Sequence, residues 1–112
     1  MINKTGFVIA IYKDGKFVTI EPDGKAAWIK EHKSEIYDSN GCRYIDVGLG
    51  DIENLPSYTG EEIIVNKMVA LYGWSIGRDD LIYLDGKLVI HNDQTVASQT
   101  LARKKTNSRC VS

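Results

Sequence analysis

Short runs of alternating apolar and polar residues fill much of the chain, and Asp-Gly or Asn-Gly pairs separate several of these runs. The stretch 11–18 (IYKDGKFV) recurs as 82–89 (IYLDGKLV), with six of eight positions identical. In both copies the DG pair lies between aromatic and β-branched residues. This pattern is typical of a β-hairpin with a type I′ turn, because both central residues of that turn need positive φ. The repeat therefore predicts hairpins near both ends of the chain, the second one pairing 80–84 with 87–91.

The turn positions also predict which side chains face each other across each hairpin. A two-residue turn at Asp14-Gly15 gives the facing pairs Lys13 and Lys16, Tyr12 and Phe17, Ile11 and Val18, and Ile9 and Ile20. A turn at Asn40-Gly41 gives the pairs Asp38 and Arg43, Tyr37 and Tyr44, and Ile36 and Ile45. Aromatic, β-branched and opposite-charge pairs stabilise antiparallel sheets. Between these hairpins, Pro22-Asp23-Gly24 predicts a further turn, followed by a strand to about residue 30.

The middle of the chain changes pattern. Residues 46–58 contain two glycines and a proline and keep no period, which predicts an exposed loop. Thr59 and Glu62 then form a capping-box pattern, which predicts a helix from about residue 60 to 72 that ends at Gly73. A second helix is expected across 94–105, capped by Asn92 or Asp93.

The expected fold is α+β, in a single small domain. It is an antiparallel sheet of hairpins, with about five strands, a helix and two strands, in which the main helix packs on one sheet face. We expect this domain to span 1–93, and 94–112 to form a basic C-terminal helix or tail. A length of 112 residues leaves no room for a second independent core.

Charge is distributed unevenly along the chain. The formal net charge is only −1. The segment from Glu35 to Glu62, however, contains seven acidic residues and one basic residue, Arg43, which gives it a net charge of −6. The last twelve residues contain four basic residues and no acidic one. The acidic middle favours a basic partner. The two cysteines lack metal or redox spacing, and no apolar window suits a leader or a membrane span, so we expect a cytoplasmic protein without membrane contact.

The five residues 73–77 (GWSIG) match the G-x-S-x-G pattern of the hydrolase nucleophile elbow, and Asp79, Asp80 and His91 follow in the hydrolase order. That elbow lies between a strand and a following helix. Here a helix is expected before Ser75 and a strand after it. The sequence therefore favours a linker role for Ser75 over a nucleophilic one.

The histidines and glycine-rich segments give no cofactor or metal prediction. His32 has no second ligand at metal spacing, and His91 faces Asp80 in the expected hairpin, a pairing that is more often structural. Residues 38–41 resemble the start of a calcium-binding loop, but Arg43 occupies the position that needs glycine and no glutamate stands at the twelfth position. Residues 48–51 lack the third glycine and the lysine of a phosphate-binding loop.

Three functions of different class remain. The leading one is a small non-enzymatic binding protein, an inhibitor or regulator of phage or mobile-element type. It would recognise a protein with a basic surface through an acidic face composed of Tyr37, Tyr44, Asp46, Asp51, Glu53, Tyr58 and Glu61. The second is a homo-oligomer that binds a small ligand, since the expected 60–72 helix is almost wholly apolar. The third is a hydrolase using Ser75. Direct nucleic-acid binding ranks below a protein partner, because the aromatics are not interleaved with Lys or Arg.

Overall fold

The described residues form two four-stranded β-sheets, and the first of them, sheet A, combines parallel and antiparallel strand pairs. The computed structural model describes residues 1–86, 88–91 and 95–105. Sheet A consists of β1 (Ile2–Asn3), β6 (Ile63–Ile64), β7 (Leu81–Asp85) and β10 (Thr100–Arg103), in that spatial order. β6 is parallel to both β1 and β7, whereas β10 is antiparallel to β7. Strands distant in sequence therefore form its centre.

The second sheet, sheet B, has the order β3 (Lys16–Ile20), β2 (Ile9–Lys13), β9 (Thr95–Ser98) and β8 (Val89–His91). β2 forms an antiparallel hairpin with β3 on one side and lies parallel to β9 on the other. β8 pairs with β9.

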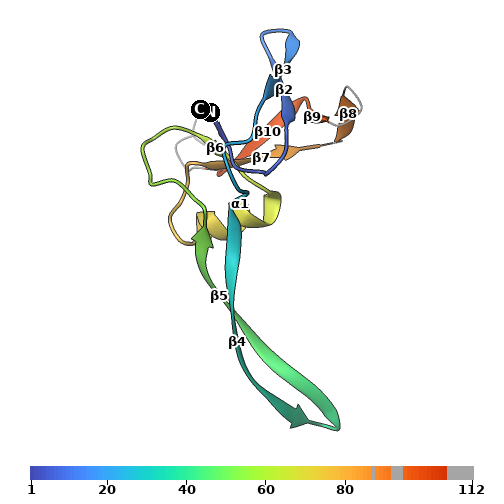
Figure 1. Ribbon diagram of the computed structural model, residues 1–112, viewed down its shortest axis with the longest axis vertical. Helices are drawn as coiled ribbons and strands as arrows, with labels where there is room; N and C mark the ends of the chain where they lie inside the picture. Colours follow the sequence, from blue (N-terminus) through green and yellow to red (C-terminus); the bar gives the residue numbers. More distant parts are fainter. Residues whose placement is uncertain (87, 92–94, 106–112) are drawn as a thin grey trace.

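The remaining two strands form a separate ribbon. β4 (Trp28–Ser39) and β5 (Cys42–Glu53) pair only with each other, as an antiparallel arm that extends away from both sheets (Figure 1). The molecule measures 57 × 41 × 26 Å, with a radius of gyration of 17.2 Å. A compact domain of this length has a radius of gyration of about 13 Å. The arm accounts for this elongated shape.

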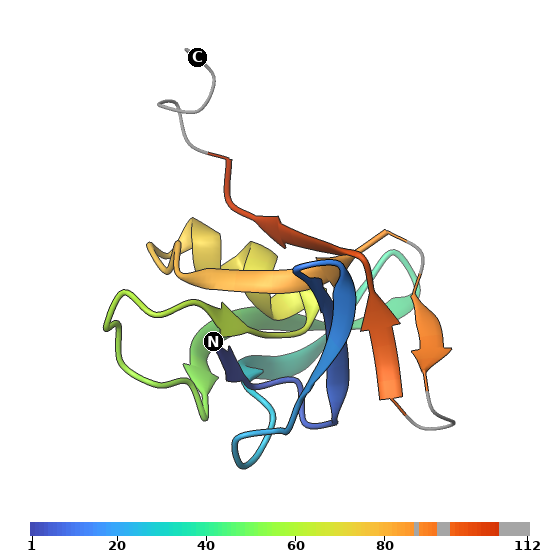
Figure 2. The same ribbon diagram turned by 90° about the horizontal axis from the view of Figure 1, so that it is seen from above.

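Helix α1 (Lys67–Ser75) lies beside β7, as Figure 2 shows. Val69 and Ala70 pack with Leu81 in a cluster that also holds Ala27 and Ile29 at the base of the arm. A second cluster, with Ile9 and Ile11 from sheet B and Ile64 and Ile82 from sheet A, fills the space between the sheets. In the described residues, no helix is long and apolar enough to cross a membrane.

The sequence predictions of a sheet-rich domain and of two hairpin registers are confirmed. All four pairs around Asp14-Gly15 and all three around Asn40-Gly41 face each other as expected. Asp14 and Asn40 have φ of 53°, and Gly15 and Gly41 have φ of 82° and 78°, as a turn with two positive φ values requires. The expectation of a wholly antiparallel sheet is wrong, because β1, β6 and β7 run parallel, as do β2 and β9.

The predicted helix from residue 60 to 72 is wrong at its start. Ile63 and Ile64 form strand β6, and α1 begins only at Lys67. Apolar runs of this length suit a buried strand as well as a helix, and β-branched residues favour the strand. Thr59 therefore caps no helix. Gly73 lies inside α1, where a Cβ would collide with the side chain of Leu81.

Three further expectations are corrected. The stretch 46–53, expected to be a loop, is the second half of β5. The turn at residues 22–24 does not join paired strands, because β3 and β4 belong to different sheets. The expected 94–105 helix is replaced over 95–103 by β9 and β10, which complete sheets B and A.

The second copy of the repeat does not form the expected hairpin. β7 pairs with β6 and β10 instead of β8. β8 pairs with β9, and in that pair His91 is opposite Thr95. Asp80 instead bonds to Arg78, and the side chain of His91 lies outside the described residues.

Candidate interaction surface on the arm

The arm has almost no core of its own. Every residue from 30 to 49 is exposed, in contrast to the buried strands of the two sheets. In the part of the chain that the structure describes, the arm is fixed at its base. Ile29 and Ile52 join the first core cluster there, and the hydroxyl of Tyr72 on α1 donates to the carbonyl oxygens of Leu49 and Gly50 at 3.1 and 2.7 Å.

One face of the arm carries four aliphatic side chains. Ile45, Val47 and Leu49 alternate along β5 and so point to the same side, and Ile36 faces Ile45 on β4. The exposed fractions of these four, which we call the apolar face, are 64% for Ile36, 42% for Ile45, 48% for Val47 and 51% for Leu49. Glu31, the partner of Leu49, shares its side of β4 with the buried Ile29. The apolar face therefore continues the line of the core outward.

The opposite face carries the tyrosine pair, which with Asp46 we call the tyrosine face. The rings of Tyr37 and Tyr44 stack with centroids 5.9 Å apart. The Tyr37 hydroxyl donates a 2.9 Å hydrogen bond to the carboxylate of Asp46. This bond raises the pKa of Tyr37 because it stabilises the protonated phenol, and slight desolvation acts in the same direction.

Ion pairs leave the charges of the arm partly compensated. Arg43 contacts Asp38 at 3.3 Å and Lys33 contacts Glu31 at 3.9 Å, both on the apolar face. Within the described residues, Glu35, Asp51 and Glu53 have no ion pair. The arm from 28 to 53 holds six acids and three bases, a balance of −3. Uncompensated negative charge therefore accompanies the exposed apolar side chains.

The seven residues predicted to form one acidic face lie in separate places. Tyr37, Tyr44 and Asp46 form the tyrosine face in the outer half of the arm. Asp51 and Glu53 lie at its base, where the pairing register shifts. Tyr58 and Glu61 belong to the 54–62 connection, and Glu61 binds the N-terminal ammonium at 2.8 Å, beside β1. Sequence reasoning therefore found the tyrosine face but missed the apolar face, although the spacing of Ile45, Val47 and Leu49 carries a period-two signal.

A polar cluster ties the 54–62 connection to sheet A. Arg78 forms two hydrogen bonds to Asp80, at 3.0 and 2.8 Å, and a third to the carbonyl of Pro56. The bonds to Asp80 raise the pKa of Arg78, and burial opposes this. Arg103 forms a similar two-bond pair with Glu62. These groups are paired with each other, so the cluster serves the fold.

Ser75 lies at the end of α1 rather than at a turn from strand to helix. Its hydroxyl donates to the carbonyl of Tyr72 at 2.5 Å, and no described base contacts it. His32 lies in β4 opposite Gly48, on the exposed arm. Among the described residues, no group of three or more His, Cys, Asp or Glu side chains could hold a metal ion.

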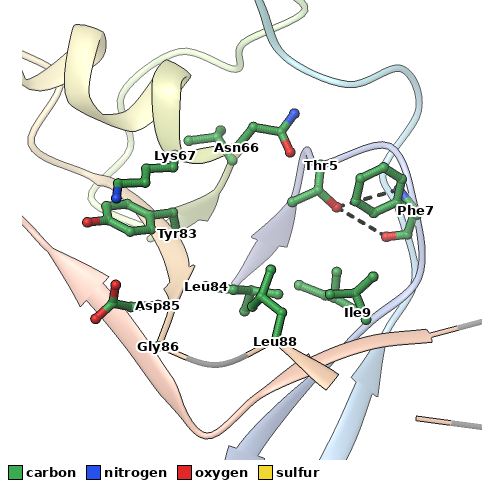
Figure 3. Close-up of a pocket in the computed structure, with 12 residues that line it drawn as sticks. Thr5, Phe7, Ile9, Asn66, Lys67, Tyr83, Leu84, Asp85, Gly86 and Leu88 are labelled. Atoms are coloured by element: carbon green, nitrogen blue, oxygen red, sulfur yellow. Dashed lines mark hydrogen bonds between the residues drawn. The ribbon is translucent and has the colours of Figure 1, made fainter. Parts of the chain in front are cut away.

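A mainly apolar hollow lies away from the arm. It measures about 390 Å³ and opens between the ends of the two sheets, with Phe7, Ile9, Tyr83, Leu84 and Leu88 among its walls (Figure 3). Lys67, the first residue of α1, stands over the ring of Tyr83.

Comparison of the chain with family models, with curated proteins and with solved structures finds no match.

Proposed function

We propose that this chain is a non-catalytic binding protein that contacts a protein partner through its β4–β5 arm. One observation carries the proposal: four aliphatic side chains share one face of a ribbon whose residues 30 to 49 are all exposed. Contiguous exposed apolar side chains are typical of interaction surfaces. The arm contributes little to the core, so folding alone does not require them.

The charge of the arm suggests the chemistry of the partner. An interface commonly combines an apolar centre with a polar rim. The apolar face supplies the centre, and the unpaired acids Asp51 and Glu53 at its base supply negative charge. A partner with an apolar strip flanked by Lys and Arg complements both, and the opposite charges would speed the encounter. Through such a contact the chain would act as an inhibitor or regulator of its partner.

The first experiment removes the apolar contact. The variant Ile45→Ser with Val47→Ser is compared with Val18→Ser, which changes a similarly exposed aliphatic residue on β3, 36% exposed and outside the arm. Both are used to capture proteins from native lysate, and the captured partner is then measured in purified form. We expect the arm variant to weaken binding at least about tenfold. Equal binding by both variants contradicts the proposal.

The second experiment separates the acids of the arm from those outside it. Asp51→Lys with Glu53→Lys should weaken and slow association and flatten its salt dependence, because complementary charge acts mainly on the encounter. Glu61→Lys is the matched control, since Glu61 contacts the N-terminus rather than the arm. A larger effect from Glu61→Lys would move the contact to the 54–62 connection.

Light scattering on the unbound protein tests the second function class. The apolar 60–72 segment that suggested a homo-oligomer is largely accounted for by burial, because Ile63, Ile64 and Val65 are core residues. A stable dimer that Ile45→Ser with Val47→Ser dissociates would assign the apolar face to a second copy of the chain instead of a different partner.

A further inference from the structure

The hollow between the two sheets has the size and lining of a small-molecule site. Its volume of about 390 Å³ falls within the range of about 300–1,000 Å³ that ligand pockets occupy. Ile9 from β2 and Leu84 from β7 line its inner end, where the second core cluster begins. Phe7 and Leu88, both about half exposed, stand at its open side.

Hydrogen bonds within the chain hold one wall of this hollow in place. The side chain of Asn3, which is 1% exposed, donates to the carbonyl oxygens of Phe7 and Ile20 at 2.8 and 3.0 Å. The Thr5 hydroxyl donates to Asn3 at 2.6 Å. These bonds fix the turn that presents the Phe7 ring, so the pocket is preformed and a ligand need not order this wall.

Two side chains of opposite charge, Lys67 and Asp85, line the pocket and form no ion pair with each other. The ammonium of Lys67 lies 5.8 Å from the centroid of the Tyr83 ring. Among the described residues, neither Lys67 nor Asp85 has an ion pair. Figure 3 shows both side chains beside Tyr83, with Lys67 on one side and Asp85 on the other. The side-chain amide of Asn66 also lines the pocket, and it caps no helix N–H.

We propose that this pocket binds a small zwitterion with an apolar body, such as a free amino acid with a large apolar side chain. The apolar body would occupy the space between Phe7, Leu84 and Leu88, which buries hydrocarbon from water. The carboxylate of the ligand would bind Lys67, and its ammonium would bind Asp85. A ligand with one charge leaves either Lys67 or Asp85 without a partner, and one without an apolar body leaves the pocket empty. The proposal does not depend on the arm.

Calorimetric titration of the full chain with four probes tests each part of the ligand. L-phenylalanine carries all three features, 3-phenylpropionate lacks the amine, 2-phenylethylamine lacks the carboxylate, and glycine lacks the apolar body. We expect L-phenylalanine to bind at least about tenfold more tightly than any of the other three, since each charge-assisted hydrogen bond contributes at this level. Absence of L-phenylalanine binding at millimolar concentration, or equal binding of 3-phenylpropionate, overturns the proposal.

Two rim variants assign the charges of the ligand. Lys67→Met should weaken L-phenylalanine binding about tenfold or more and leave 2-phenylethylamine unchanged, because that probe has no carboxylate. Asp85→Asn should weaken L-phenylalanine and leave 3-phenylpropionate unchanged. Lys13→Met, an exposed lysine outside the pocket, is the matched control and should change nothing. If Lys67→Met and Asp85→Asn leave L-phenylalanine binding as in Lys13→Met, its contact lies elsewhere and the proposal fails.

Discussion

The arm and the two-sheet body use the same kind of turn but bury very different amounts of their side chains. Each contains an antiparallel hairpin closed by a two-residue turn with positive φ at both positions. In the body, Ile64 and Ile82 are at most 1% exposed between the sheets. In the arm, Ile36 is 64% exposed, in a part of the ribbon where every residue from 30 to 49 is exposed.

This difference separates the residues that stabilise the fold from the residues that are exposed on the surface of the arm. Burying an aliphatic side chain contributes about 1.5–3 kcal/mol. The body gains this many times over, whereas the outer arm gains almost none. A two-stranded ribbon alone is marginal in water. The arm therefore depends on its base, where Ile29, Ile52 and Tyr72 fix it to the body. Its outer side chains add little to the core, which is why we propose them for recognition.

A matched pair of substitutions tests this contrast most strongly. Ile82→Ala should lower the free energy of unfolding by about 2–5 kcal/mol, because it leaves a cavity between the two sheets. Ile36→Ala makes the same chemical change on a strand of the arm, and should lower it by less than about 1 kcal/mol. Urea denaturation followed by circular dichroism measures both.

A comparable loss of stability in the two isoleucine variants would contradict the contrast. It would mean that the apolar face of the arm is covered in solution, for example by a second copy. Repeating the Ile36→Ala measurement at several protein concentrations distinguishes that case, since only a stability gained by association depends on concentration.

The two hairpin turns provide a second test with a smaller effect. Gly15 and Gly41 have φ of 82° and 78°, where a β-branched residue is strained by about 1–3 kcal/mol. Gly15→Val should lower the stability of the whole body by this amount, because β2 lies in the centre of sheet B and carries Ile9 and Ile11 into the core.

Gly41→Val should produce the same local strain with a different readout. The tip of the arm can open while the body stays folded, so the urea midpoint should shift little and amide hydrogen exchange should rise along the outer parts of β4 and β5. If Gly41→Val lowers global stability as much as Gly15→Val, the arm and the body unfold as one unit.

Local signals in the sequence predicted local structure well. The turns at Asp14-Gly15 and Asn40-Gly41 and their facing pairs were predictable, because a two-residue turn sets the register by itself. The Asp85-Gly86 copy carries the same signal, and Gly86 does have a φ of 74°. Its flanking strands nevertheless pair with β6, β10 and β9. Burial across the whole sheet decides which distant strand each of them pairs with, and the sequence of a turn holds no information about that choice.

Two glycines explain why the second half of β5 was predicted as a loop. Gly48 and Gly50 broke the alternation and suggested a loop, yet both lie in β5. A Cβ at Gly50 would collide with the ring of His32 on the neighbouring strand. The glycine therefore makes room for a cross-strand side chain, which is visible only once the two strands are paired. The period-two spacing of Ile45, Val47 and Leu49 is visible in the sequence, but only the pairing with β4 shows that this side of the ribbon stays exposed.

The candidate site was predictable only in part. Tyr37, Tyr44 and Asp46 were named from the sequence and lie together, because the hairpin register places them on one face. Tyr58 and Glu61 are close to them in sequence but lie on the connection beside sheet A. The pocket of Phe7 and Tyr83 joins segments far apart in the chain, and no spacing in the sequence indicates such a meeting.

The tyrosine face provides the smallest and most local test. The hydrogen bond from Tyr37 to Asp46 raises the pKa of Tyr37 above its ordinary value of about 10. Because the pKa is higher in the folded than in the unfolded chain, the stabilising contact is fully present below pH of about 10 and is lost as the pH rises through the folded-state pKa. Asp46→Asn removes the negative charge and should bring the pKa of Tyr37 back down, measured by carbon NMR of labelled tyrosine.

Asp51→Asn is the matched control for this titration, since it removes one carboxylate of the same arm that does not contact Tyr37. If both variants lower the pKa of Tyr37 equally, the overall charge of the arm sets it and the specific hydrogen bond does not. A shift seen only in Asp46→Asn shows that the outer arm holds its paired register in solution. The tyrosine and apolar faces then exist as formed surfaces before any partner arrives, because one register places the side chains of both.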